Sequence, residues 1–125
     1  MTAYHEAILD LRHIYLEDSY VLGIHEVEGA LLFDLLAVLT ENHPAYQVPT
    51  EDVQYCYRAA RLSFESHLDF DWIERHFDAR TVDPDGSIDY GHIDGFEIMP
   101  DGYHLDGDWG AVKIRCNLIR LTLRD

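Results

Sequence analysis

A short pattern with metal-binding chemistry occurs four times in the second half of the chain. It consists of a histidine, one apolar residue and an aspartate, and random placement of the 8 histidines and 15 aspartates would give about one His-x-Asp triplet, whatever its middle residue. On a β-strand, positions i and i+2 share a face, so the imidazole and the carboxylate would point outward together. Imidazole and carboxylate groups on neighbouring strands are ligands for a divalent metal. The four copies are His67-Leu68-Asp69, His76-Phe77-Asp78, His92-Ile93-Asp94 and His104-Leu105-Asp106.

The same pattern also fits a polar surface without a site. A half-buried strand in an aspartate-rich chain produces polar-apolar-polar triplets automatically, and the chain has no His-Glu-x-x-His motif and no zinc-type Cys/His spacing. A metal or catalytic centre therefore requires that the triplets converge in space. The candidate metal ligands are His76, Asp78, His92, Asp94, His104 and Asp106.

A second candidate site is the acidic segment 83–108, which contains eight carboxylates and no lysine or arginine. Turns that gather these carboxylates would form an acidic surface that attracts a basic protein. Exposed tyrosine and tryptophan side chains are typical energetic anchors of interfaces, and Tyr103 in the segment and Trp109 beside it are candidates for this role. The predicted binding surface consists of Asp83, Asp85, Asp89, Asp94, Glu97, Asp101, Tyr103, Asp106, Asp108 and Trp109.

The overall charge supports a cationic partner. The chain has 24 acidic and 9 basic residues, which gives a net charge of −15. Binding to nucleic acid or to an anionic membrane requires a basic patch, and between Arg12 and Arg58 there is no lysine or arginine. We therefore predict no nucleic-acid or membrane partner. A strongly negative field attracts metal ions, amines or a basic protein, although it also serves solubility alone.

Targeting and redox features point to the cytoplasm. The N-terminus has neither a positive region nor a long apolar run, so no signal peptide is predicted. The longest apolar stretch, 30–39, is interrupted by Asp34 and is well short of the roughly 20 residues that cross a bilayer. Cys56 and Cys116 lack a Cys-x-x-Cys neighbour and are predicted to be free thiols. Phosphate-binding glycine loops and the nucleophile motif Gly-x-Ser-x-Gly do not occur, and no cofactor is predicted.

Apolar spacing predicts the elements of the first half. Helical spacing over 3–15 predicts one short N-terminal helix. The runs 20–27 and 30–39 are joined by Glu28-Gly29, which favours a β-hairpin, although the second run would also fit a buried helix. Further along, we expect a loop over 42–50, a helix over 51–61 capped by Thr50, and a strand over 62–68. The segment 70–82 is interpreted as a strand, with helical spacing as the alternative.

The last third carries regular turn signals. They are Asp83-Pro84-Asp85-Gly86, Asp94-Gly95, Pro100-Asp101-Gly102 and Asp106-Gly107. From Val112 the apolar residues alternate as in a strand, and after Leu118 they continue one residue out of phase, which predicts a β-bulge or bend near Leu118-Ile119. Short strands with tight turns indicate a single domain, 1–125, that is mainly β: an antiparallel meander forming a small barrel or sandwich with a short N-terminal helix.

These observations lead to two function hypotheses. The first is a small acidic cytoplasmic binding or inhibitory module that presents its acidic surface to a basic protein; in size and charge alone it is similar to the immunity proteins of bacterial toxin systems. The second is a metal-binding protein or metal-dependent enzyme that uses His-x-Asp pairs on adjacent strands. A barrel that binds a ligand in an apolar lumen is a third possibility, supported by fold class only.

Overall fold

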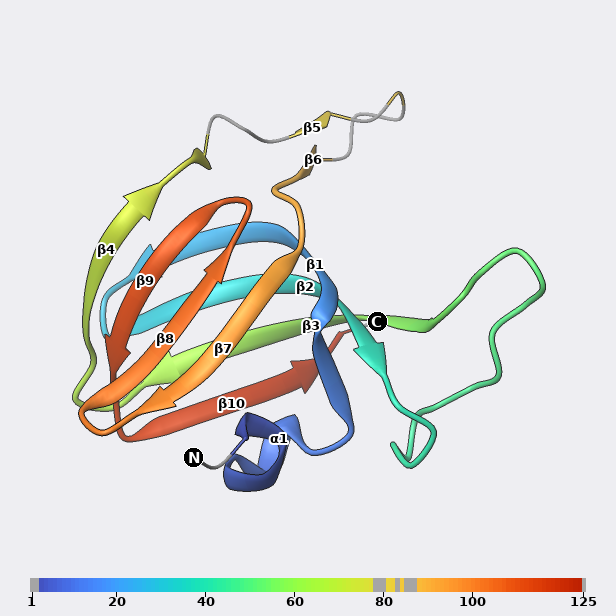
Figure 1. Cartoon of the computed structure of the whole chain (residues 1–125), viewed down its shortest axis with the longest axis horizontal. Helices are drawn as coiled ribbons and strands as arrows, with labels where there is room; N and C mark the ends of the chain where they lie inside the picture. The colour runs from blue at the N-terminus through green and yellow to red at the C-terminus, as the bar shows by residue number, and fades with distance from the viewer. Residues whose placement is uncertain (1–2, 78–80, 83, 85–87, 125) are drawn as a thin grey trace.

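A computed structural model gives the fold and describes residues 3–77, 81–82, 84 and 88–124. The chain begins with a one-turn helix and a 3₁₀ turn, and β-strands follow (Figure 1). The elements are α1 (Tyr4–Ala7), η1 (Leu9–Leu11), β1 (Ile14–Val27), β2 (Ala30–Leu39), β3 (Cys56–Glu65), β4 (Asp69–Arg75), β5 (Thr81–Val82), β6 (Ile88–Asp89), β7 (Ile93–Met99), β8 (Gly102–Gly107), β9 (Gly110–Arg115) and β10 (Leu118–Leu123).

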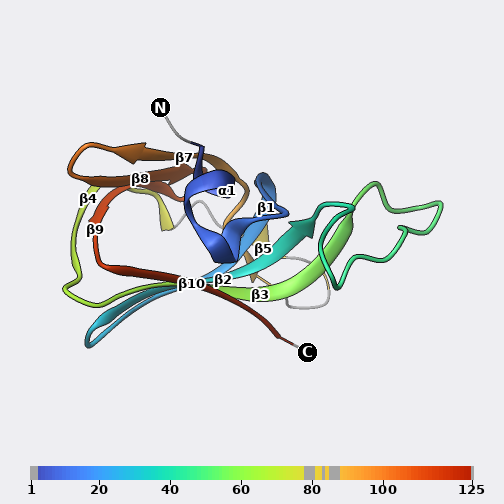
Figure 2. The same cartoon turned by 90° about the horizontal axis from the view of Figure 1, so that it is seen from below.

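The long strands form two antiparallel four-stranded sheets. Sheet A has the order β1-β2-β3-β10 and sheet B the order β4-β9-β8-β7, while β5 and β6 make a separate two-stranded ribbon. Figure 2 shows the two sheets as separate layers that face each other. The prediction of a mainly β, antiparallel domain with a short N-terminal helix is confirmed. The sheets are not closed into a barrel, so the arrangement is that of a sandwich.

The two layers enclose one cluster of buried apolar side chains. Alternate residues of β2 and β3 point into it because a strand directs every second side chain to the same face. Phe33 and Phe64, on neighbouring strands, pack edge to face with ring centroids 6.1 Å apart. Trp109, from the turn between β8 and β9, lies 5.1 Å from Phe33 and joins the two sheets through the core.

The predicted phase slip in the last strand marks a change of sheet. Val112 and Ile114 of β9 are buried in sheet B, and Ile119 of β10 packs against the same core from sheet A. A strand that passes to the opposite layer must reverse the face that carries its apolar residues. The break itself lies at 116–117, slightly before the predicted position. The β3–β4 corner is similar, with Ser66 at φ 67° and His67 at φ 53°.

Two predictions about helices need correction. The N-terminal helix ends at Ala7, and Ile14 already belongs to β1. The helix expected over 51–61 is wrong, because β3 begins at Cys56 and pairs with β2 on one side and β10 on the other. These long-range pairings outweigh a local helical pattern. The hairpin over 20–39 and the strand character of 70–75 are confirmed.

The predicted turns were only partly correct. Pro100-Asp101 forms the β7–β8 turn as expected, whereas the β8–β9 turn lies at 108–109, just after Asp106-Gly107. Asp94-Gly95 is not a turn: both residues belong to β7, at a register shift opposite Asp106. A side chain at position 95 would start 2.9 Å from the Asp106 carboxylate, so this glycine admits the aspartate. Of the predicted turn 83–86, only Pro84 lies within the described residues.

Candidate functional site

The outer surface of the β7–β8 hairpin carries the densest group of predicted site residues. Phe96 and Leu105 pair across the hairpin and are buried, so their neighbours along each strand point outward. Glu97 lies opposite His104 in the register. Asp94, Glu97, His104 and Asp106 form what we call the acidic face. Asp94 and Glu97 are exposed, and the other two side chains are half-buried.

Electrostatic repulsion acts within the acidic face. The pKa of Asp106 is raised, first because the carboxyl is partly buried and also because Asp94 and Glu97 carry like charges close by. His104 opposes this shift. Asp94 and Glu97 are therefore near enough to disfavour the ionisation of Asp106. The described contacts give Asp106 no arginine or lysine partner.

The other half of sheet B is charge-balanced. Asp69 of β4 forms an ion pair with Arg115 of β9, and this contact raises the pKa of Arg115. Asp71 lies opposite Lys113, which in turn lies opposite His104 on β8. The outer surface of sheet B thus changes from paired charges on β4 and β9 to carboxylates in excess on β7 and β8.

The remaining predicted carboxylates lie around the hairpin rather than on the acidic face. Asp101 is exposed in the β7–β8 turn. Asp108 accepts a hydrogen bond from the backbone N–H of His92 at 3.2 Å, and Asp89 accepts one from that of Gly91 at 2.5 Å. Asp108 and Asp89 therefore stabilise turns of the backbone. Asp78, Asp83 and Asp85 lie outside the described residues.

The two predicted aromatic anchors do not lie on this surface. Trp109 is fully buried, because the β8–β9 turn directs its ring between the sheets, where it contacts Phe33 and Trp72. Tyr103 is half-buried and packs on Phe96 with ring centroids 5.7 Å apart. It lies opposite Ile114, a core residue, in the register of sheet B. Trp109 cannot contact a partner without leaving the core, whereas Tyr103 lines a hollow beside the β7–β8 turn.

Parts of two His-x-Asp copies, namely Asp94, His104 and Asp106, meet on the acidic face, whereas the other described histidines of the pattern lie elsewhere. His67 lies at the β3–β4 corner beside Asn117, with Nδ1 and Nδ2 2.9 Å apart. His76 follows β4 and contacts Glu74, with Nε2 and Oε2 3.5 Å apart. The ring of His92 packs against that of Tyr20 in a tilted arrangement, with ring centroids 4.3 Å apart. Among the described residues, no three or more His, Cys, Asp or Glu side chains are arranged to hold a metal ion.

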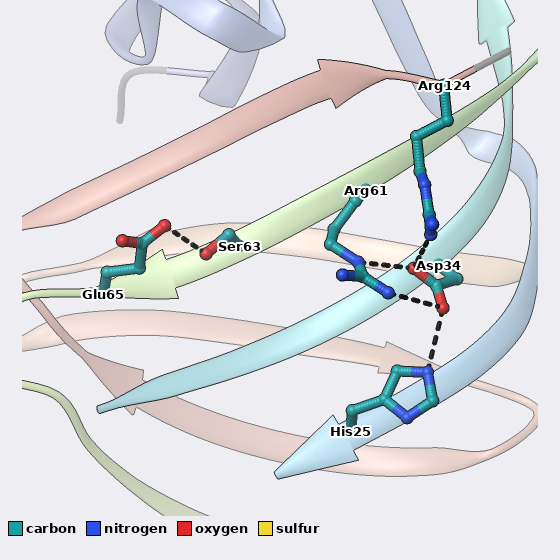
Figure 3. A network of polar contacts seen from close by, with 6 residues as sticks. All are labelled: His25, Asp34, Arg61, Ser63, Glu65 and Arg124. Atoms are coloured by element: carbon teal, nitrogen blue, oxygen red, sulfur yellow. Dashed lines mark hydrogen bonds and ion pairs between the residues drawn. The ribbon is translucent and has the colours of Figure 1, made fainter. Parts of the chain in front are cut away.

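A network on the outer face of sheet A was not identified from the sequence (Figure 3). Asp34 accepts two hydrogen bonds from Arg61, at 2.7 and 3.2 Å, and one from Arg124 at 3.1 Å. His25 Nε2 lies 2.9 Å from Oδ2 of Asp34, the oxygen that Arg124 does not contact. Partial burial acts to raise the pKa of Asp34, but the bonds from Arg61 and His25 outweigh it and lower the pKa. The only sequence signal was an isolated aspartate in an apolar run.

Comparisons with other proteins add no function to this geometry. No protein-family model, curated protein or solved structure matches the chain. Within the described residues, no helix combines the length and the apolar character needed to cross a membrane. The candidate function therefore depends on the placement and charge of the side chains.

Proposed function

We propose that the protein is a cytoplasmic binding module whose acidic face contacts the basic surface of a protein partner and thereby masks or inhibits that partner. The observation that supports this most directly is the group of Asp94, Glu97 and Asp106 on one hairpin, where partial burial, together with the like charges of Asp94 and Glu97, raises the pKa of Asp106. The net charge of −15 adds a long-range field of the same sign.

A basic partner would relieve a repulsion that the free protein carries. An incoming lysine or arginine replaces a like-charge neighbour by an opposite charge, so the free energy of binding includes the loss of that repulsion. The hairpin also suits this task mechanically. It is paired to β9 and anchored in the core by Phe96 and Leu105, so the carboxylates need little ordering on binding.

The experiment compares two variants with matched charge changes. The test variant is Asp94→Lys/Glu97→Lys/Asp106→Asn, and the control is Glu6→Lys/Glu28→Lys/Asp52→Asn, three exposed acidic residues away from the acidic face. Each immobilised protein captures partners from a lysate of the cells that make it, and the captured proteins are quantified by mass spectrometry. We expect basic proteins that the wild type and the control retain and the test variant loses.

The outcome separates a specific face from a general charge effect. Equal loss in both variants would mean that only net charge matters. Unchanged capture by the test variant would exclude the acidic face. Circular dichroism and thermal unfolding of each variant confirm that a loss of capture does not reflect loss of the fold.

A further inference from the structure

A tyrosine-lined groove lies away from the acidic face, where the start of β1 and the end of β2 meet the connection 40–55. It encloses about 310 Å³. Its floor includes the buried residues Val38, Leu39 and Cys56. The aromatic rings of Tyr15, Tyr46 and Tyr55 line it, from β1 and from the connection.

The connection that builds the groove is unusually long for a loop without helix or strand. Figure 1 shows it projecting beyond the ends of β2 and β3. Connections longer than roughly 12–15 residues without secondary structure are uncommon in compact domains and often carry binding functions. Tyr46 attaches the connection to the core, and the N–H of Gln47 donates to Cys56 Sγ at 3.4 Å.

The groove has the charge and the aromatic surface that a cation requires. The exposed carboxylate of Glu41 lines it, and none of the described residues that line it is lysine or arginine. A hydrogen bond with Asp18 raises the pKa of Tyr55, which places a second carboxylate beside the groove. An adjoining hollow of about 260 Å³ shares Tyr15 and Thr40 and adds Glu17.

The protein binds one of its own arginines with the same combination of groups. The guanidinium of Arg75 lies over the rings of Trp72 and Phe77, 5.2 and 4.6 Å from their centroids. It also pairs with Glu26, with Nη2 and Oε2 3.6 Å apart. Aromatic faces and a carboxylate together favour a planar cation. In the groove, the same combination of aromatic rings and a carboxylate is accessible from solvent.

We propose that this groove binds an arginine side chain presented by a protein partner. The guanidinium lies against the rings of Tyr15 and Tyr55, and Glu41 supplies the counter-charge. The site does not depend on the acidic face, so either proposal can fail without the other.

The direct test is an NMR titration with a capped amino acid. N-acetyl-arginine-N-methylamide is added to the full chain while the tyrosine ring signals and the backbone amide signals are recorded; the citrulline analogue, which has a similar shape but no charge, is the control. We expect saturable shifts for Tyr15, Tyr46 and Tyr55 with arginine and none with citrulline. Equal responses to both compounds, no response, or shifts confined to the acidic face would overturn the proposal. Tighter binding of tetramethylammonium than of arginine would overturn the assignment to a guanidinium.

Variants of the groove identify its contributing groups. Tyr15→Leu should weaken arginine binding about fivefold and Glu41→Gln about twofold. Glu28→Gln removes another exposed carboxylate, in the β1–β2 turn, and should leave binding unchanged. The NMR signal of the buried Trp109 indole reports whether the core of each variant is intact. If Tyr15→Leu does not fold, the comparison of Glu41→Gln with Glu28→Gln still tests the proposal. Equal arginine binding by these two variants would contradict it.

Discussion

The surroundings of a half-buried aspartate on the outer face of sheet A and on that of sheet B shift its pKa in opposite directions. On sheet A, Asp34 accepts hydrogen bonds from two arginines and contacts His25, and its pKa is lowered. On sheet B, the pKa of Asp106 is raised, by partial burial first and also by the like charges of Asp94 and Glu97. The same residue type therefore stabilises one face and repels its neighbours on the other. Part of the unbalanced negative charge of the chain therefore lies on the acidic face.

The difference indicates which face is available to a partner. Sheet A has a second charged pair, in which Glu65 is neutralised by Arg120. Hydrogen bonds from Ser63 and Arg120 lower the pKa of Glu65. A basic partner at sheet A would have to displace arginines that are already in place. At the acidic face it would meet carboxylates without a described arginine or lysine partner, so we expect binding there.

The largest effect on stability should come from removing the centre of the sheet A network. Asp34→Ala leaves Arg61 and Arg124 without their shared carboxylate, and we expect a loss of about 1–2 kcal/mol of unfolding free energy after solvent screening is allowed for. Urea unfolding at neutral pH measures it. Thr122→Ala, beside Arg61 on the same face, is the control. Equal unfolding free energies for the two variants would refute the role given to Asp34.

Acid should remove the contribution of Asp34. Its native pKa lies below the ordinary value of 3.8, so the unfolded chain takes up this proton first as the pH falls. The stabilisation is fully present above pH 4 and is lost as the pH falls through the lowered native pKa. The difference in unfolding free energy between wild type and Asp34→Asn should therefore shrink below about pH 4. A difference that stays constant down to pH 2 would contradict the ion-pair account.

The acidic face should respond in the opposite direction and by less. Asp106→Asn removes a charge that partial burial and two like-charged neighbours disfavour, and it should raise the unfolding free energy by a few tenths of a kcal/mol at neutral pH. The raised native pKa means that the folded protein takes up this proton first, so the advantage of Asn disappears as the pH falls through that value. Asp101→Asn, in the exposed turn, is the matched control. Destabilisation by Asp106→Asn at neutral pH would contradict the repulsion.

The fold could be predicted where local pattern and tertiary pairing agree. The alternation of Val112 and Ile114 with polar residues predicted β9, and the later phase slip predicted the bend into β10. The helix expected over 51–61 failed because β3 is defined by partners on β2 and β10 that no local pattern reveals. Trp109 was misplaced for a related reason, since a tryptophan in a turn points to the core or to solvent according to the packing of distant strands.

The candidate site was predictable in part. The high density of acidic residues in the sequence predicted Asp94, Glu97 and Asp106 as binding residues. The β7–β8 hairpin brings them together because they are near in sequence. Asp34 could not be assigned a role, because its partners Arg61 and Arg124 lie 27 and 90 residues away. Contacts over such separations become visible only once the strand order is known.

Zero-length cross-linking of the captured complex tests the central claim most directly. A carbodiimide joins a carboxylate to a lysine that touches it, so mass spectrometry of the linked peptides identifies which carboxylates contact the partner. We predict links at Asp94, Glu97 and Asp106 and few at Glu65 or Glu28. Links concentrated on Glu65 and Glu28, or spread evenly over the exposed carboxylates, would contradict the acidic face as the binding surface.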